Sequence, residues 1–359
     1  MPNTPIITPI VTDVVVIGAG PVGLFAVFQC GMMKMSCHVV DALDEVGGQL
    51  SALYPEKPIY DIPGFPEILA GELISMLEAQ AAPFSPVYHL GQQVMGLDSL
   101  EGGRFKLTTS KGQEIDAGAV IIAAGVGAFG PNRPPMDGIM DFEGMGPGRG
   151  VNYLVKRRDD FKGKKVVIAG GGDSAVDWAI SLSELAESVA VVHRRPKFRA
   201  APESVTRLEA LVAEGKVEMV VPFQLAGLEG SAEQLDAVVV ADLDGNKRTL
   251  EADVLLPFFG LSQNIGPIAE WGLGLENHHI TVNPATMESD VKGVFGAGDI
   301  TTYPGKLKLI LMGFSEASQA AHNARHHIHP DEAYHFEHST SSGVPVGVPA
   351  NILDGAKRS

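Results

Sequence analysis

The chain has few cysteines: only Cys30 and Cys37 occur among its 359 residues. Their spacing matches neither a metal-binding pair nor a Cys-x-x-Cys redox motif, and Cys30 falls within a predicted helix. We therefore expect both to be reduced, buried or half-buried thiols. This removes dithiol chemistry from the functions to consider.

Long apolar runs and an excess of positive charge are also missing. No stretch approaches the roughly 18 apolar residues that a membrane-spanning helix needs. Residues 1–12 lack a basic segment followed by an apolar one, which predicts a cytoplasmic protein. The formal net charge of −16 argues against nucleic-acid binding, which requires a basic surface. A local basic patch for an acidic protein partner is still compatible with that charge.

Glycine, in contrast, is abundant, and two glycine-rich motifs each follow an apolar run, residues 14–17 and 166–169. A single Gly-x-Gly-x-x-Gly is weak evidence, but here each motif lies between a predicted strand and a predicted helix (residues 21–32 and about 174–185). Such glycines let the backbone approach a pyrophosphate, whose charge then lies at the helix N-terminus. Two motifs predict two bound dinucleotides, and therefore redox chemistry. The candidate phosphate-binding residues are Gly18, Gly20, Pro21 and Gly23 in the first motif, and Gly170, Gly172, Asp173, Ser174 and Ala175 in the second.

The residue that follows the second strand of each unit indicates which nucleotide binds there. In the first unit, strand 38–40 ends at Asp41, whose carboxylate is placed to accept hydrogen bonds from a ribose. The alternative is a solvated acid at a strand end. With no basic residue nearby, this unit suits an unphosphorylated adenosine such as the ADP half of FAD.

In the second unit, strand 189–192 ends in basic residues where an NAD-binding unit would have an acid. A guanidinium there can pair with the 2′-phosphate of NADP(H). A solvated basic face is the alternative. The candidates for this 2′-phosphate site are His193, Arg194, Arg195 and Arg199, with Lys197 beside them.

Two other regions bear on the organisation of the chain. Residues 47–66 are rich in glycine and proline, so we predict a loop whose aromatic side chains either pack on a flat ring or simply anchor the loop. The His-rich stretch at 322–329 has no acidic or cysteine partner nearby, so we interpret it as a solvated helix end and expect no metal site.

With these motifs in view, the whole chain resembles the thioredoxin-reductase-like (type 2) ferredoxin–NADP reductases. The most specific matching segments are Gly47–Lys57, Tyr60–Phe65, Gly170–Trp178 and Lys306–Ile310. The resemblance implies an α/β fold with two Rossmann-like, three-layer ββα dinucleotide-binding domains, the second inserted in the first. We expect residues 1–126 and 292–359 to form the FAD-binding domain and residues 127–291 to form the NADP(H)-binding domain.

The resemblance also implies roles for individual residues around FAD. Asp41 would hold the adenosine ribose, and Gln49 and Tyr54 would lie beside the flavin, with the Tyr54 ring stacked on one face. Asp299 matches the Gly-Asp acid that binds the ribityl or pyrophosphate region. Further FAD contacts implied by the family are Val94, Phe129 and, in the C-terminal tail, His338 over the other flavin face and Thr340.

The implied activity is electron transfer between NADP(H) and ferredoxin or flavodoxin through FAD, by a homodimer, without an obligatory acid, base or nucleophile. Thioredoxin reductases carry a Cys-x-x-Cys just before the second glycine-rich strand, but this chain has no cysteine in Val151–Lys156. Electrons would therefore leave the flavin directly. The alternatives are an NADPH oxidase or diaphorase that reduces oxygen, quinones or small acceptors, and a non-catalytic nucleotide sensor.

Overall fold

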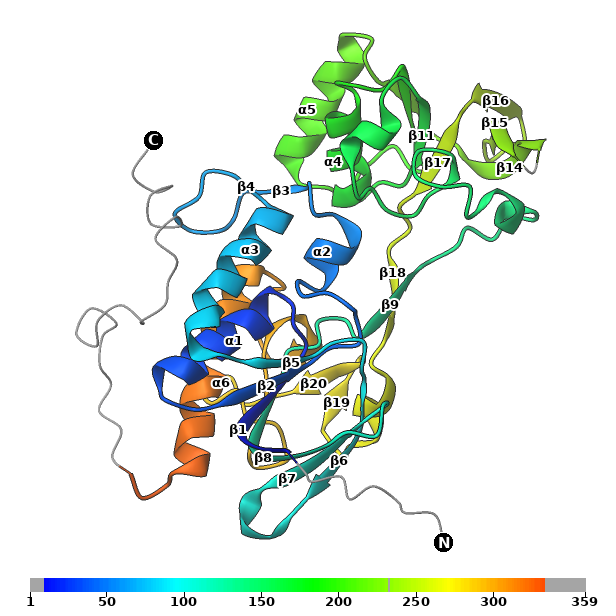
Figure 1. Ribbon diagram of the computed structural model, residues 1–359. Coiled ribbons are helices and arrows are strands. Elements are labelled where there is room, and N and C mark those ends of the chain that lie inside the picture. The colour runs from blue at the N-terminus through cyan, green and yellow to red at the C-terminus, as the bar shows by residue number, and fades with distance from the viewer. Residues whose placement is uncertain (1–9, 232, 333–359) are drawn as a thin grey trace, which may run out of the picture. The chain divides into compact units, whose positions relative to one another are not determined.

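In the computed structural model, which describes residues 10–231 and 233–332, the chain folds into two compact units (Figure 1). The discontinuous unit combines residues up to Ala128 with those from Gln263 onward. The inserted unit is Phe129–Ser262. Each unit is an α/β structure built around its own parallel sheet.

The predicted boundary at residue 291 is wrong. Residues 263–291 belong to the discontinuous unit, because Ile265, Ile280 and Met287 are buried in its core. In addition, strand β20 (His279–Thr281) pairs in parallel with β22 (Thr301–Thr302) of the same unit. A loose, turn-rich stretch in the sequence therefore conceals the point where the chain returns.

The sheet of the discontinuous unit has the strand order β5–β2–β1–β8–β7–β6, and β21 also pairs with β8. The second half of strand β1 is apolar, and its residues Val14, Val15 and Val16 are fully buried. This is expected of a parallel strand covered on both faces. The parallel strands are β1 (Ile10–Ile17), β2 (Cys37–Val40), β5 (Val87–His89), β8 (Glu114–Ile122) and β21 (Val294–Gly296).

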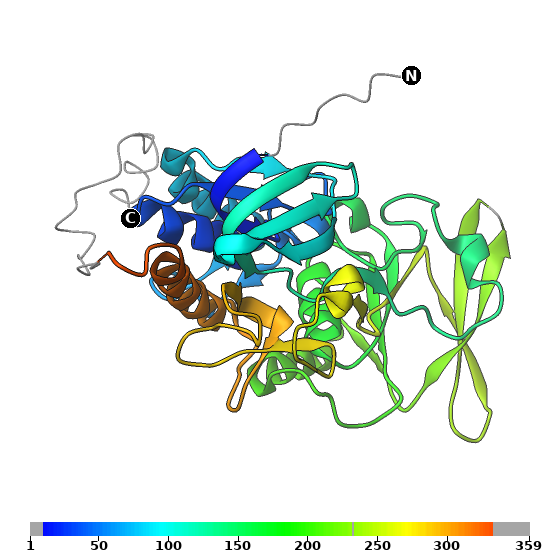
Figure 2. The same ribbon diagram turned by 90° about the horizontal axis from the view of Figure 1, so that it is seen from below.

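Strand β8 takes part in two pairings of opposite sense. Its first half pairs antiparallel with β7 (Phe105–Thr109), which in turn pairs with β6 (Val94–Ser99). On its other edge β8 runs parallel to β1 from Ile115 to Ile122, and its last residues also pair in parallel with β21. The antiparallel ribbon thus continues from the first half of β8, while helices pack on the parallel strands, which matches the ββα arrangement expected of this unit (Figure 2).

Helices α1 (Pro21–Met32) and α6 (Ile310–Ile328) pack on the parallel strands, and α3 (Ala70–Ala81) packs against α1 (Figure 1). Gly20 caps α1 and Pro21 occupies its first turn. The N–H that proline lacks would have no partner within the helix at this position. The face of α6 that meets the core is made of small residues, including the fully buried Ala317, Ala320 and Ala321. Small side chains allow the close approach of α6 to α1.

The inserted unit repeats the same layering. Its parallel sheet has the order β10–β17–β11–β12–β13, and a separate antiparallel sheet has the order β14–β15–β16. The antiparallel sheet packs on the parallel one, since Val238 and Leu250 share a core with Val167 and Leu255. The elements are β10 (Gly150–Val151), β11 (Lys165–Ala169), α4 (Asp173–Leu182), β12 (Ser188–Val192), α5 (Pro202–Ala213), β13 (Glu218–Val220), β14 (Gln224–Ser231), β15 (Gln234–Ala241), β16 (Lys247–Glu251) and β17 (Val254–Pro257).

The segment predicted as a pure loop is partly regular. It contains a short helix, α2 (Gln49–Leu53), and a two-stranded ribbon in which β3 (Pro58–Ile59) pairs with β4 (Ile68–Leu69). The prediction of a loop is wrong for α2 because Leu50 anchors that helix in a core with Leu24, Leu73 and Ile74. The remaining strands are β9 (Ala128–Pro131), β18 (Leu261–Asn264) and β19 (Leu275–Glu276), and the 3₁₀ turns are η1 (Ala82–Phe84), η2 (Glu101–Gly103), η3 (Ile139–Phe142), η4 (Arg158–Phe161), η5 (Gly266–Glu270) and η6 (Gly298–Ile300).

None of the helices within residues 10–231 and 233–332 combines the length and the apolar character that crossing a bilayer would require.

Candidate functional site

Two glycines of the first motif are tightly packed against the backbone, and the third faces open space. A methyl group added at Gly23 would lie 1.9 Å from the Gly18 carbonyl oxygen, and one added at Gly18 would lie 2.4 Å from the carbonyl oxygen of Ala123. Gly18 also has a φ of +109°, which L-residues rarely adopt. A methyl group at Gly20, in contrast, would have no atom within 4 Å. Gly18 and Gly23 therefore bring α1 close to β1 and β8, while Gly20 leaves space for a ligand.

This open space lies at the N-terminus of α1. Gly20 is the N-cap residue with extended backbone, and no side chain caps the helix. The first N–H groups of a helix have no partner within it, and together with the helix dipole they favour an anion. The end of α1 thus offers backbone donors and positive potential beside an open glycine.

Asp41, at the end of β2, is tied to the glycine loop. Its Oδ2 accepts a hydrogen bond from the Ala19 N–H at 2.6 Å, and its Oδ1 accepts one from the Leu43 N–H at 2.8 Å. Burial raises the pKa of Asp41, while these two backbone donors act in the opposite direction. The side chain is half-buried and ordered by the backbone, so a freely solvated acid does not describe it. Each oxygen can still accept a further hydrogen bond, and ribose binding stays a prediction.

Residues far apart in the sequence meet at this cradle. A methyl group added at Gly48 would lie 3.2 Å from the Gly20 Cα, so α2 begins against the glycine loop. The Gln49 Nε2 would lie 3.7 Å from a methyl group added at Gly125. The side chain of Gln49, the first residue of α2, therefore lies close to Gly125, three residues after the end of β8.

Tyr54 and Asp299 lie within electrostatic range of each other beside the same cradle. Burial raises the pKa of Tyr54, and the negative charge of Asp299 raises it further, which places the carboxylate near the phenol. Tyr54 ends α2, and the Lys57 ammonium lies 5.8 Å from the centre of its ring. Asp299 lies in η6, where a methyl group added at Gly298 would be 3.3 Å from Val22 in the first turn of α1. The structure thus brings together α1, α2 and η6.

The other predicted FAD contacts are placed less directly. Val94 begins β6 with its side chain buried in the core, two residues after Gln92, whose N–H donates to the Asp41 carbonyl at 2.9 Å. Its backbone therefore runs close to Asp41, as an adenine-side backbone contact requires, but the contact itself is untested. Phe129 lies in β9, and its side chain is outside the described part of the chain. His338 and Thr340 are outside the described residues altogether.

The second motif shows the same division. A methyl group added at Gly170 would lie 2.8 Å from the Phe258 carbonyl oxygen, whereas one at Gly172 would meet no atom within 4 Å. Gly172 is the N-cap of α4, again without a side-chain cap. The Asp173 Oδ1 accepts the Ala201 N–H at 2.8 Å. Ser174 is exposed in the first turn and Ala175 is buried beneath it, so this helix end is also open on one side.

Basic side chains gather beside this second helix end. The Arg199 N–H donates to the Gly171 carbonyl at 2.7 Å, and His193 lies so close to Gly171 that a methyl group there would be 2.3 Å from its ring. Burial lowers the pKa of His193, a hydrogen bond from its ring to the Lys197 backbone acts in the opposite direction, and the charges of Arg199, Arg194 and Arg195 lower the pKa further. The positive charges of three guanidinium groups are therefore all felt at His193, next to the phosphate cradle.

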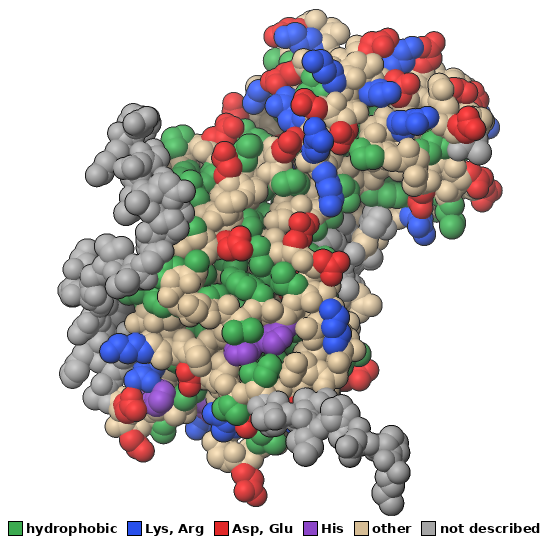
Figure 3. All heavy atoms as spheres, in the orientation of Figure 1, with side chains coloured by type: hydrophobic (Ala, Val, Ile, Leu, Met, Phe, Trp, Pro, Cys, Tyr) green, Lys and Arg blue, Asp and Glu red, His purple; other side chains and the backbone are tan. Residues whose placement is uncertain are grey.

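Charge is otherwise mixed over the visible face of the inserted unit, where basic and acidic side chains alternate (Figure 3). Residues 193–199, which follow directly after strand β12, are in contrast a cluster of basic side chains. In the part of the chain that the structure describes, no carboxylate pairs with Arg194, Arg195 or Arg199. Their charges are free to meet an anion.

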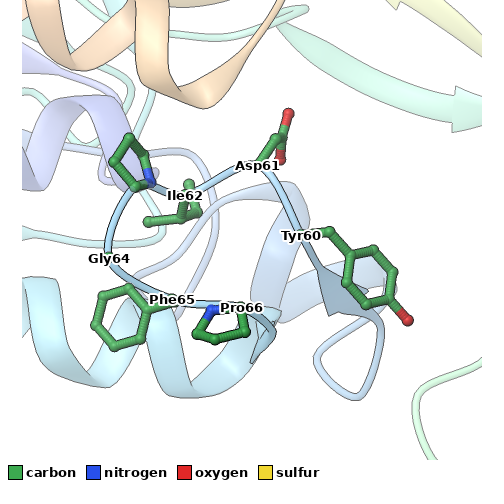
Figure 4. Close-up of a pocket in the computed structure, with 7 residues that line it drawn as sticks. Tyr60, Asp61, Ile62, Gly64, Phe65 and Pro66 are labelled. Atoms are coloured by element: carbon green, nitrogen blue, oxygen red, sulfur yellow. The ribbon is translucent and has the colours of Figure 1, made fainter.

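One surface hollow is formed by a single loop, residues 60–66, with a volume of ≈ 530 Å³ (Figure 4). Tyr60 and Phe65 are exposed by 59% and 38%, and Ile62 points back toward the protein core. The hollow includes none of the predicted cofactor-binding residues. We therefore do not assign this hollow to either of the two predicted nucleotide sites.

One buried group of the first site escapes sequence analysis. Glu316 of α6 is 2% exposed and its Oε2 accepts the Gly298 N–H at 2.7 Å, next to Asp299. A signal is nevertheless present, because Glu316 lies on the helix face that also carries Gly313, Ala317 and Ala320. A charged residue on a buried face requires a buried partner.

Residues 12–327 match the model of the pyridine nucleotide-disulphide oxidoreductase family. Among curated proteins, the chain is 66% identical over 336 residues to a ferredoxin–NADP reductase of Paramagnetospirillum magneticum, covering 94% of this chain and 98% of that one. It is 64% identical over 346 residues to a ferredoxin–NADP reductase of Rhodospirillum rubrum, covering 96% and 99%.

Solved structures give the same fold. The thioredoxin reductase of Lactococcus lactis superposes with a TM-score of 0.75 at 24% identity, over 88% of this chain and 99% of that chain. The thioredoxin reductase of T. acidophilum gives 0.74 at 25% identity, over 88% and 97%. Both comparisons confirm the predicted pair of dinucleotide-binding domains, one inserted in the other. The chain therefore belongs to the pyridine nucleotide-disulphide oxidoreductase family, and within it to the thioredoxin-reductase-like ferredoxin–NADP reductases.

Proposed function

We propose that this protein transfers electrons between NADP(H) and ferredoxin or flavodoxin through FAD. The observation that carries the proposal is the presence of two open helix-end cradles, one beside an acid and one beside guanidinium groups, in a chain 66% identical to a ferredoxin–NADP reductase. Bound FAD supplies the chemistry that side chains lack, the conversion between a two-electron donor and a one-electron acceptor.

The residues of the discontinuous unit fit FAD. The open face at Gly20 and the uncapped N-terminus of α1 would receive the pyrophosphate, and the remaining acceptor capacity of Asp41 would receive the adenosine ribose. Asp299 and Gln49 lie on the same cradle and would bind the ribityl side and the flavin edge. Tyr54 would exclude water from one face of the ring.

The residues of the inserted unit fit NADP(H). Gly172 and the end of α4 would receive the pyrophosphate, and Arg194 and Arg195 would hold the 2′-phosphate, with Arg199 assisting. These side chains bind and orient; none of them has to move a proton. We further propose that the protein works in the cytoplasm and, as the resemblance implies, as a homodimer.

The proposal is tested by anaerobic titration of the purified protein with NADPH, followed by a cytochrome c reduction assay with and without added ferredoxin. We expect a yellow protein whose flavin absorbance is bleached by NADPH and whose cytochrome c reduction depends on ferredoxin. High activity without ferredoxin would favour a diaphorase. A protein without flavin, or with a flavin that NADPH cannot reduce, would contradict the proposal.

The depressed pKa of His193 leads to a pH prediction. A 2′-phosphate beside the guanidinium groups would stabilise the imidazolium and raise that pKa, so NADPH binding takes up protons. We expect NADPH affinity to rise by roughly twofold between about pH 8 and about pH 7, where a phosphate with a second pKa of about 6 is still mostly dianionic. Calorimetric titrations at several pH values measure this slope.

Two comparisons control for other titrating groups. NADH lacks the 2′-phosphate and is expected to show little of this slope, and His193→Gln is expected to remove it for NADPH. Equal slopes for both nucleotides in the unmodified protein would show that His193 does not sense the phosphate.

A further inference from the structure

Glu316 is a buried charge in a helix face otherwise made of small residues. It is 2% exposed and lies on α6 between Gly313 and the fully buried Ala317 and Ala320. The close approach of α6 to α1 leaves little space here, since a methyl group added at Gly313 would lie 2.4 Å from a Val22 methyl. A carboxylate at such a position requires compensation by several donors.

Three donors from a single preceding segment supply that compensation. The Glu316 Oε2 accepts the Gly298 N–H at 2.7 Å, and its Oε1 accepts the Tyr303 hydroxyl at 2.6 Å and the Lys306 ammonium. The side chain of Lys306 is only 6% exposed, and its ammonium lies 5.5 Å from the centre of the Tyr303 ring. Burial raises the pKa of Tyr303, and its hydrogen bond to Glu316 raises it further.

These contacts fix the segment 298–306 at both ends. At its start, Gly298 has a φ of +79°, and its carbonyl oxygen accepts the Thr301 hydroxyl at 2.8 Å. Gly298 also packs on Val22 in the first turn of α1. Asp299 is the next residue, so the bond from the Gly298 N–H to Glu316 sets where Asp299 stands relative to the end of α1.

Stability alone is a poor explanation for this arrangement. Buried ion pairs are often no more stabilising than apolar residues of similar volume, because desolvation offsets their attraction. What an apolar pair cannot do is accept the hydrogen bond of the Gly298 N–H. The geometric role of the carboxylate is therefore the part that apolar packing cannot replace.

We propose that Glu316 is a positioning residue for the flavin cofactor: by accepting the Gly298 N–H, and with its charge balanced by Lys306, it holds Asp299 in place beside the N-terminus of α1. This inference rests on the proposed function, since it assigns the cradle to FAD. Glu316 acts through the backbone of η6 and does not itself touch the cofactor.

Two double variants isolate this hydrogen bond. Lys306→Met with Glu316→Gln removes both charges but keeps an acceptor for the Gly298 N–H, whereas Lys306→Met with Glu316→Leu removes both charges and the acceptor. The two variants are alike in net charge and similar in volume. The measurements are the Kd of FAD for the apoprotein by fluorescence, the visible circular dichroism of the bound flavin, and thermal unfolding with and without FAD.

We expect the leucine variant to bind FAD roughly tenfold more weakly than the glutamine variant, because a buried N–H then lacks a partner. Its flavin circular dichroism should change, and its gain in melting temperature on adding FAD should shrink. Glu332→Gln, which breaks the ion pair with Arg325 just beyond the other end of α6, serves as the control and should leave the Kd unchanged.

Equal FAD affinities of the two folded double variants would overturn the inference alone. A wild-type protein that takes up no FAD would overturn both the inference and the proposed function. If the leucine variant does not fold, Glu316→Asp replaces it: the charge is kept but the carboxylate no longer reaches the Gly298 N–H. An unchanged FAD Kd in that variant would equally overturn the inference.

Discussion

Replacing Arg194 and Arg195 together with alanine is expected to weaken NADPH binding by roughly 100-fold while changing NADH binding by about threefold or less. The physical reason is that the two nucleotides differ only in the 2′-phosphate, and each charge-assisted hydrogen bond to that group is lost with its guanidinium. Both side chains are exposed and their fields already act together on His193. The measurement is the Kd of each nucleotide, from equilibrium titration of the flavin-loaded protein.

Arg207→Ala provides the matched control, because Arg207 is an exposed arginine of the same unit on α5. It should leave both affinities unchanged, which excludes a general effect of lowering the positive charge. An equal loss for NADPH and NADH in the double variant would show that these arginines do not bind the phosphate. The choice between the two nucleotides would then reside elsewhere in the inserted unit.

Adding a methyl group to the first glycine motif is expected to give opposite results at two positions three residues apart. Gly20→Ala should leave folding intact, since the new methyl group meets no atom within 4 Å, but should weaken FAD binding by roughly 100-fold because it occupies the open face of the cradle. Gly23→Ala should destabilise the protein by about 3 kcal/mol, because the methyl group would lie 1.9 Å from the Gly18 oxygen and overpack the core. Thermal unfolding of the apoprotein and FAD titration separate the two effects.

Gly172→Ala extends the test to the inserted unit. Its methyl group also meets no atom within 4 Å, so folding and FAD binding should be unaffected while NADPH binding is lost. If Gly20→Ala bound FAD normally, the pyrophosphate would not approach that glycine. If Gly23→Ala were as stable as the wild type, the tight packing between α1 and the Gly18 loop would not be needed.

Most of the cofactor chemistry could be predicted from local sequence. The bounds of α1 coincide with the predicted 21–32, and the strands before both motifs end where predicted, although β1 begins four residues earlier than expected. The agreement arises because strand, turn and helix lie within about 20 residues and each leaves its own pattern. Asp41 and the basic residues after β12 follow from the same local logic. Nothing beyond adjacent residues is needed to find them.

The segment that begins at residue 47 shows that local sequence patterns do not predict every helix. Its glycines and prolines predict irregular structure, yet α2 forms there because Leu50 is buried against Leu24 of α1 and Leu73 of α3. The stabilisation comes from packing with helices that are distant in sequence, and a short helix gains little from propensity alone. Composition therefore gave no indication of α2.

The sequence by itself determined that the chain has two phosphate cradles, that their flanking residues differ in charge, and that no dithiol links them. Only the tertiary structure decided that residues 263–291 return to the discontinuous unit and that Tyr54 lies near Asp299. It also decided that Glu316 anchors the turn that carries Asp299. The reason is physical: a phosphate cradle is built from neighbouring residues whose spacing is visible in the chain, whereas a buried carboxylate gains its partners only when α6 packs against the segment that precedes it.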